Sequence, residues 1–107
     1  MRLEHYPIDK LKKELLEIIG KHLDLSKYKV FFFGSRVTDK GDDRSDIDVG
    51  IEGTERIPGH IMENIREEIE SLPTLYTIEI VDFQSVSDEF YKIAKKYIEG
   101  INEPISG

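Results

Sequence analysis

The chain has 107 residues and a net charge of −7, and 35% of its residues are charged. This length suits one domain with a modest core, without space for a second substrate-binding domain, and the acidic surface excludes binding along an extended nucleic-acid backbone. The absence of cysteine excludes disulfides and thiolate metal sites. No apolar run is long enough for a signal segment or a membrane span, so we expect a cytoplasmic protein.

The first predicted element is an amphipathic helix that runs from Ile8 to near Leu23. Apolar residues recur there at helical spacing, with lysines and glutamates between them. A buried strand is predicted next over Lys29–Phe33, because this run is almost wholly apolar and rich in β-forming side chains. The strand ends abruptly at Gly34-Ser35, and its three phenylalanines are expected in the core.

The turn after this strand has the residues of a phosphate-binding turn. Gly34 lets the backbone approach a ligand closely, and the Ser35 hydroxyl and free N–H groups of the turn can face a phosphate oxygen. Arg36 can add a planar positive charge to the same group. An ordinary turn with a solvated arginine is the alternative for these three residues. A polar stretch over 37–44 is expected to lie over the site, and Arg44 at its end is a further candidate for phosphate contact.

Ser45–Ile51 is predicted to form the second strand, because its apolar residues alternate with the others. Asp46 and Asp48 therefore project from one face, about 6.5–7 Å apart along the strand. Two such carboxylates repel each other and raise one pKa unless a cation lies between them. Mg²⁺ is the natural candidate, since it prefers carboxylate and phosphate oxygens. A pair of solvated aspartates on an exposed strand is the alternative.

A second helix and a third strand follow. Isoleucines at fourfold spacing over 57–69 mark the buried stripe of the helix, which Pro73 ends. The third strand, predicted over 76–83, contains Glu79 and Asp82. These two acids are three residues apart and point to opposite faces, so at most one of them can join the first pair.

The last predicted element is a helix that starts after the serine N-caps near 85–87 and ends at Gly100. Its apolar stripe is formed by residues over 90–98. The alternation of helices and strands along the chain predicts an α/β sandwich. We expect a small mixed β-sheet, with helices packed on one side and an open acidic face on the other.

The combination of Gly34-Ser35-Arg36 with Arg44-Ser45-Asp46-Ile47-Asp48 resembles the signature of the minimal nucleotidyltransferases. These are the small MNT-type members of the DNA polymerase β-like nucleotidyltransferase superfamily. The resemblance covers most of the chain and implies a single minimal domain over residues 1–107 with the nucleotidyltransferase fold. It also implies a Mg²⁺-dependent transfer of a nucleoside monophosphate, AMP from ATP, to an acceptor hydroxyl.

The family pattern also has a third carboxylate on a neighbouring strand, usually an aspartate. Matching the pattern assigns this position to Glu79, whose side chain is one methylene longer, while Asp82 at the strand end is better explained as a turn residue. The resemblance implies that the acids hold the metal ions and support the transfer, and that the turn binds the triphosphate. The catalytic and metal-binding candidates are Asp46, Asp48 and Glu79, and the nucleotide-binding candidates are Gly34, Ser35, Arg36 and Arg44.

The family resemblance further implies a protein partner. Many MNT proteins are paired with HEPN-domain proteins in toxin–antitoxin modules, where the MNT protein acts as antitoxin by binding the toxin or by transferring AMP to one of its tyrosines. We therefore expect a tyrosine of a HEPN-type toxin as the acceptor. Two alternatives stay open: a catalytically weak or inactive MNT antitoxin that neutralises its partner by binding, which Glu79 favours, and a small-molecule nucleotidyltransferase of the aminoglycoside type.

Overall fold

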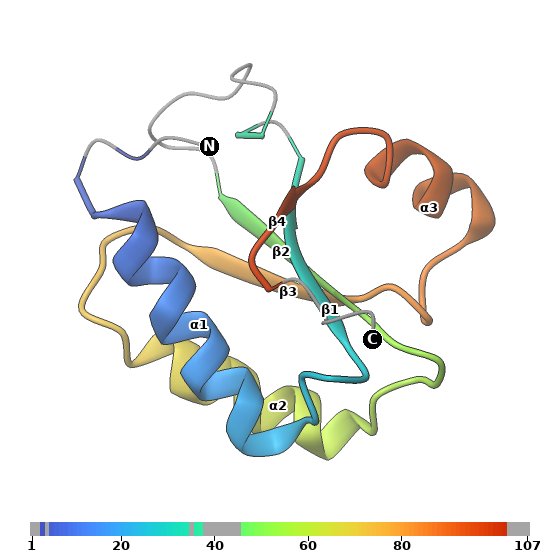
Figure 1. Ribbon diagram of the computed structural model, residues 1–107, viewed down its shortest axis with the longest axis horizontal. Coiled ribbons are helices and arrows are strands. Elements are labelled where there is room, and N and C mark those ends of the chain that lie inside the picture. The colour runs from blue at the N-terminus through green and yellow to red at the C-terminus, as the bar shows by residue number, and fades with distance from the viewer. Residues whose placement is uncertain (1–2, 4, 35, 38–45, 103–107) are drawn as a thin grey trace.

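The computed structural model describes residues 3, 5–34, 36–37 and 46–102. Three helices and four strands follow one another along this part of the chain (Figure 1). In chain order they are α1 (Ile8–His22), β1 (Lys29–Phe33), β2 (Ile47–Glu52), α2 (Gly59–Glu70), β3 (Ile78–Asp82), α3 (Asp88–Ala94) and β4 (Glu99–Gly100). In the described residues no helix has the length and apolar character that a membrane span requires.

The strands form one sheet in the order β3-β2-β1-β4. β1 is antiparallel to both β2 and β4, whereas β2 and β3 are parallel. A parallel pair needs a long crossover, and α2 supplies it between β2 and β3. The predicted α/β fold with a small mixed sheet is therefore confirmed.

Helices α1 and α2 cover one face of the sheet (Figure 1). Their apolar stripes meet alternate residues of the strands, so that one continuous core forms. The predicted stripes account for most of this core. Ile8 and Ile61 are only partly buried, however, and Met62 of α2 is buried although the predicted stripe did not include it. The most deeply buried members are Leu11, Leu15, Ile19, Val30, Phe32, Ile47, Val49, Ile51 and Ile65.

The short helix α3 lies on the opposite face, which the sequence analysis did not expect (Figure 1). There Phe31, Phe33 and Phe83 form an aromatic cluster with Ala94 of α3. The ring centroids of Phe31 and Phe83 lie 4.9 Å apart in an edge-to-face arrangement. Gly50 leaves room for this cluster, because a Cβ there would come within 3.0 Å of both rings.

The prediction that the last helix continues to Gly100 is wrong. α3 ends at Ala94, and Glu99–Gly100 instead pairs with β1 as strand β4. The N–H of Ile101 donates to the carbonyl of Val30 at 2.8 Å, which extends this pairing. Tertiary pairing with β1 therefore overrides the helical pattern of this segment. Phe90, Ile93 and Tyr97 of the predicted stripe are exposed.

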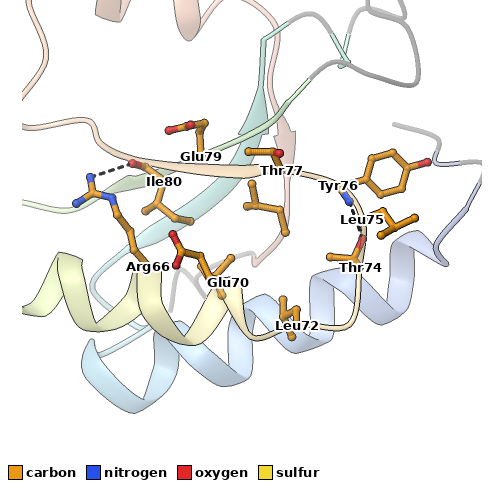
Figure 2. Close-up of a pocket in the computed structure, with 11 residues that line it drawn as sticks. Arg66, Glu70, Leu72, Thr74, Leu75, Tyr76, Thr77, Glu79 and Ile80 are labelled. Carbon is orange, nitrogen blue, oxygen red and sulfur yellow. Dashed lines mark hydrogen bonds between the residues drawn. The ribbon is translucent and has the colours of Figure 1, made fainter.

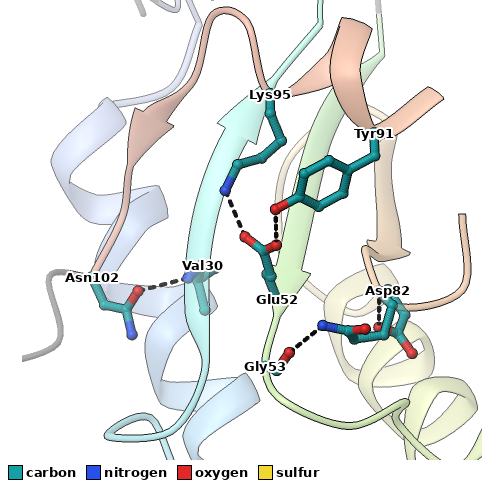
Figure 3. A network of polar contacts seen from close by, with 8 residues as sticks. Val30, Glu52, Gly53, Asp82, Tyr91, Lys95 and Asn102 are labelled. Carbon is teal, nitrogen blue, oxygen red and sulfur yellow. Dashed lines mark hydrogen bonds and ion pairs between the residues drawn. The ribbon is translucent and has the colours of Figure 1, made fainter. Parts of the chain in front are cut away.

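Polar contacts hold the α3 segment against the sheet (Figure 3). Glu52, at the end of β2, accepts hydrogen bonds from the Tyr91 hydroxyl and from Lys95 Nζ, the latter at 2.5 Å. The helix begins as the sequence predicts, because Ser87 Oγ accepts from the N–H of Phe90 at 3.1 Å as an N-cap.

Candidate functional site

Asp48 and Glu79 face each other across two neighbouring strands. Asp48 of β2 is in register with Glu79 of β3, and on its other side it is in register with Phe33, the last residue of β1. Asp46 lies just before β2, two residues ahead of Asp48, and its charge acts on the Asp48 carboxyl. The structure therefore brings Asp46, Asp48 and Glu79 together at the end of the sheet where β1 stops and β2 starts.

Negative charge accumulates in this carboxylate cluster of Asp46, Asp48 and Glu79. Partial burial of Asp48 raises the pKa of its carboxyl above the usual range, and the charges of Asp46 and Glu79 raise it further. In the described parts of the chain, no three Asp, Glu or His side chains converge closely enough to hold a metal ion as they stand. The cluster is thus electrostatically coupled but is not a formed ligand cage.

Gly34, the residue after β1, lies next to Asp48 of the carboxylate cluster. It has a φ of 86°, in the left-handed region that favours glycine, and it follows directly on the strand. A Cβ at this position would lie less than 3.0 Å from Oδ2 of Asp48. The turn continues with a hydrogen bond from the N–H of Val37 to the carbonyl of Gly34 at 3.2 Å. The backbone of the predicted phosphate-binding turn therefore lies against the carboxylate of Asp48.

The other predicted nucleotide-binding residues are only partly accounted for. Ser35 and Arg44 lie outside the described residues, as does the polar stretch beyond Val37. Arg36 is buried, and its guanidinium carbon lies 4.8 Å from the ring centroid of Tyr76. Tyr76 comes from the loop before β3, and nothing in the sequence marks it as a partner of Arg36.

Asp82 occupies a different environment from Glu79. Its Oδ2 accepts the N–H of Ile57 at 2.8 Å, and its Oδ1 accepts the N–H of Gln84 at 2.9 Å. The Ser85 hydroxyl donates to Oδ2 at 3.1 Å as well. Asp82 therefore fixes the turn after β3 and the approach to α2. Of the two acids of this strand, Glu79 is the one beside Asp48.

Two cavities adjoin the cluster along β3. One, of about 420 Å³, lies between β3 and the end of α2 (Figure 2). The other, of about 830 Å³, extends along β3 toward Val86. Both are lined by Arg66, Glu79 and Ile80. Arg66 is a residue that sequence reasoning missed, because on α2 it resembles any other solvated charge of an amphipathic helix.

Solved structures with a similar fold are toxin–antitoxin complexes. A chain of a toxin–antitoxin with AMP-PNP matches at a TM-score of 0.69 and 13% identity, over 85% of this chain and 72% of that one. A chain of a mutant toxin–antitoxin MntA–HpeT matches at a TM-score of 0.68 and 11% identity, over 85% of this chain and 71% of that one. A third match is a chain of a re-refined complex of tri-AMPylated Shewanella oneidensis HEPN toxin with MNT antitoxin. Its TM-score is 0.64 at 14% identity, and the match covers 88% of this chain and 71% of that one. At these identities the likeness shows a shared fold.

No curated protein gives a significant sequence match. The family model described as Polymerase beta, Nucleotidyltransferase, however, matches residues 13–100. The matched region contains the Gly34 turn, the carboxylate cluster and all four strands. The chain belongs to the polymerase beta nucleotidyltransferase family.

Proposed function

We propose that this protein is a Mg²⁺-dependent nucleotidyltransferase that moves AMP from ATP to a tyrosine hydroxyl of a HEPN-type toxin and acts as its antitoxin. The observation that carries the proposal is the position of Asp48, which lies between Asp46 and Glu79 and against the Gly34 turn. Carboxylates next to a backbone turn are suited to a metal-bound triphosphate, because the two features serve the cation and the phosphates respectively.

The residues present fit Mg²⁺. All three side chains of the carboxylate cluster offer the hard oxygen ligands that this ion prefers. The raised pKa of Asp48, caused by burial and by Asp46 and Glu79, reflects a repulsion that a cation relieves. Asp46, Asp48 and Glu79 would hold the metal, which when bound neutralises charge on the phosphates. Asp46 and Glu79 are exposed, which leaves their side chains room to change rotamer.

The transfer replaces the phosphoanhydride bond at the α-phosphorus of ATP by a phosphodiester bond to the acceptor oxygen. The acceptor hydroxyl oxygen forms a bond to the α-phosphorus, and the bond from this phosphorus to the oxygen that bridges to the β-phosphate breaks. Pyrophosphate leaves, and the hydroxyl proton passes to the carboxylate of Glu79. The turn of Gly34 and Ser35, with Arg36 and Arg44, orients the triphosphate for this in-line displacement. The guanidinium of Arg36 lies against the ring of Tyr76.

The choice of donor and partner is supported by similar proteins. One structure of similar fold is a toxin–antitoxin with AMP-PNP, and another is a complex of an MNT antitoxin with a tri-AMPylated HEPN toxin. A shared fold and a shared family favour the same pair of substrates here. The net charge of −7 also suits a protein partner better than a polynucleotide.

A second candidate function is neutralisation of the partner by binding alone. Two observations favour it: the third acid is Glu79, where the family pattern has an aspartate, and the described acids do not converge as they stand. Mg²⁺ requires near-ideal octahedral geometry, so one extra methylene can impair catalysis without impairing binding.

One experiment separates these two functions. The purified protein is incubated with the HEPN-type product of a neighbouring gene, ATP and Mg²⁺, and both chains are weighed by intact-mass spectrometry. The Asp46→Asn and Asp48→Asn variants serve as test proteins, and Asp9→Asn, an exposed change on α1, serves as the matched control.

AMP units on the partner that disappear in both site variants but persist in the control support the transferase. A stable complex without added mass supports the binding module and contradicts catalysis. Equal transfer by all variants contradicts the assignment of Asp46 and Asp48 to the active site.

A further inference from the structure

β3 is an edge strand of the sheet, with β2 on one side. The N–H of Ile47 donates to the carbonyl of Thr77 at 2.8 Å, and the N–H of Phe83 donates to the carbonyl of Ile51 at 2.9 Å. In a parallel pair, alternate residues of a strand turn both backbone groups toward the same neighbour. The backbone groups of Glu79 therefore face β2, and those of Ile78, Ile80 and Asp82 face outward.

Two of these outward carbonyls have partners. The N–H of Ser85 donates to Asp82 at 3.0 Å, and Nη2 of Arg66 donates to Ile80 at 3.5 Å (Figure 2). Among the described residues, none bonds the outward N–H of Ile78 or Ile80, or the carbonyl of Ile78. Such a row of backbone donors and acceptors is a template for a further strand.

The two cavities lie along this same edge. Because both are lined by Arg66, Glu79 and Ile80, they adjoin at the middle of β3. Together they form a groove, here called the β3 groove, from Leu75 before the strand to Val86 after it. Leu75, at one end of this groove, is fully exposed and so is accessible to a partner.

We propose that an extended segment of the acceptor protein adds to β3 as a fifth strand and thereby presents its hydroxyl-bearing residue beside Glu79. This inference rests on the proposed function and names how its acceptor is held. Alternating N–H and C=O groups at strand spacing are matched by another extended backbone, as in β-strand addition.

The geometry of strand pairing delivers the acceptor to the carboxylate cluster. Directly opposed residues on paired strands have Cβ atoms about 4.5–5.5 Å apart. A residue opposite Glu79 on the added strand thus lies on the face that also carries Asp48, within reach of a long side chain such as tyrosine. Its neighbours in the segment point to the other face, into the cavity between β3 and α2, where Ile69 and Leu72 offer apolar contacts.

Arg66 does not prevent this pairing. Its bond to Ile80 is 3.5 Å long, at the limit of a hydrogen bond, and its side chain is 43% exposed. The guanidinium also donates to Glu63 at 2.8 Å, so it keeps a partner when it leaves the edge. Its displacement therefore costs little.

The test measures the affinity of the complex with the HEPN-type product of a neighbouring gene by calorimetry, and AMP transfer by intact mass. Ile78→Pro removes an outward N–H, and Ile78→Ala is its matched control because it keeps that N–H while shortening the same side chain. Leu75→Asp alters the mouth of the β3 groove. Its control is Ile93→Asp, an equally drastic change at an exposed apolar residue on α3. Thermal unfolding of each variant verifies folding.

We expect Ile78→Pro and Leu75→Asp to weaken the complex at least tenfold and Ile93→Asp to stay within twofold of the unaltered protein. Ile78→Ala should lose at least fivefold less affinity than Ile78→Pro, because it keeps the outward N–H. Protection of the Ile78 and Ile80 amides from hydrogen exchange in the complex is expected as well. Unchanged affinity of folded Leu75→Asp, or a larger loss in Ile93→Asp, overturns the proposal even if AMP is transferred. A complex without transfer contradicts the proposed function, while the same variants still decide the docking site. Failure to form any complex overturns both.

Discussion

Gly34 and Asp48 are so close that the turn after β1 cannot accommodate a Cβ without displacing the carboxylate. The contact follows from the sheet, because Asp48 is in register with Phe33, the residue just before Gly34. The glycine turn and the acidic strand of the sequence motif are therefore one structural unit. Thirteen residues lie between Gly34 and Asp48 in the chain. The antiparallel pairing of β1 and β2 brings the two residues together.

Gly34→Ala is expected to reduce AMP transfer roughly 100-fold, because a displacement of Asp48 of about 1 Å disturbs the reacting geometry. A side chain at a φ of 86° also costs about 1–2 kcal/mol of stability. The measurements are the intact-mass transfer assay and the free energy of unfolding. Gly59→Ala is the control, since no atom lies within 4 Å of its added Cβ. Full activity of folded Gly34→Ala would show that the contact is dispensable.

Asp48→Asn is expected to raise the melting temperature at neutral pH while it abolishes transfer. The pKa of Asp48 is raised above 3.8 by burial and by the charges of Asp46 and Glu79, so the folded state binds the proton more tightly than the unfolded state. The ionised carboxyl therefore destabilises the folded state, and this destabilisation grows as pH rises from the unfolded pKa of 3.8 through the raised pKa of the folded state.

This destabilisation is absent at pH values well below 3.8, where the carboxyl is protonated in both the folded and the unfolded state. Melting curves of the unaltered protein and Asp48→Asn should accordingly converge as pH falls toward 3.8 and separate toward neutrality. A difference that grows on acidification would contradict the assigned direction of the pKa shift.

Mg²⁺ is expected to raise the melting temperature of the unaltered protein at neutral pH, because it relieves repulsion within the carboxylate cluster and binds only the folded state. Asp48→Asn should lose most of this effect. The exposed change Asp9→Asn should retain it, since Asp9 is a solvent-exposed residue in the first turn of α1. Equal Mg²⁺ stabilisation of all three proteins would assign the ion to some other place.

Glu52→Gln is expected to have the opposite pH signature to Asp48→Asn. Burial tends to raise the pKa of Glu52, but hydrogen bonds from Lys95 and Tyr91 outweigh it and lower the pKa. The carboxylate therefore stabilises the folded state above its unfolded pKa of 4.5, and this contribution is lost as pH falls through the lowered value.

At neutral pH we expect a loss of about 1–3 kcal/mol, as for hydrogen bonds to a charged group, measured by denaturant unfolding. The deficit should shrink on acidification. A constant deficit would mean that side-chain shape at position 52, rather than charge, holds α3 to the sheet.

Local patterns in the sequence predict the site better than they predict its surroundings. Alternation predicts that Asp48 lies on the less buried face of its strand, and the burial pattern of β2 agrees, since side-chain direction in a strand depends only on neighbouring residues. Two other features depend on residues far apart in the chain, which no local period encodes. These are the contact between Arg36 and Tyr76 and the position at which α3 ends. The edge position of β3 is likewise a property of the whole sheet.

Asn102 links the end of the described chain to the start of β1, and its removal tests how much this link stabilises the fold (Figure 3). Its Oδ1 accepts the N–H of Val30 at 2.7 Å, and its Nδ2 donates to the carbonyls of Tyr28 at 2.9 Å and Leu25 at 3.3 Å. Asn102→Ala removes all three bonds, so we expect a loss of about 2–3 kcal/mol in the free energy of unfolding.

Asn102→Asp separates the roles of the two ends of this side chain. It keeps an acceptor for the N–H of Val30 but turns a carboxylate oxygen toward the carbonyls of Tyr28 and Leu25, which repel it. We expect this variant to be at least as unstable as Asn102→Ala at neutral pH and to recover on acidification, when the carboxyl can donate a proton to a carbonyl. Denaturant unfolding across the acidic range measures this recovery. Stability equal to that of the unaltered protein at neutral pH would mean that only the bond to Val30 matters, and a deficit that does not change with pH would contradict the repulsion between the carboxylate and the two carbonyls.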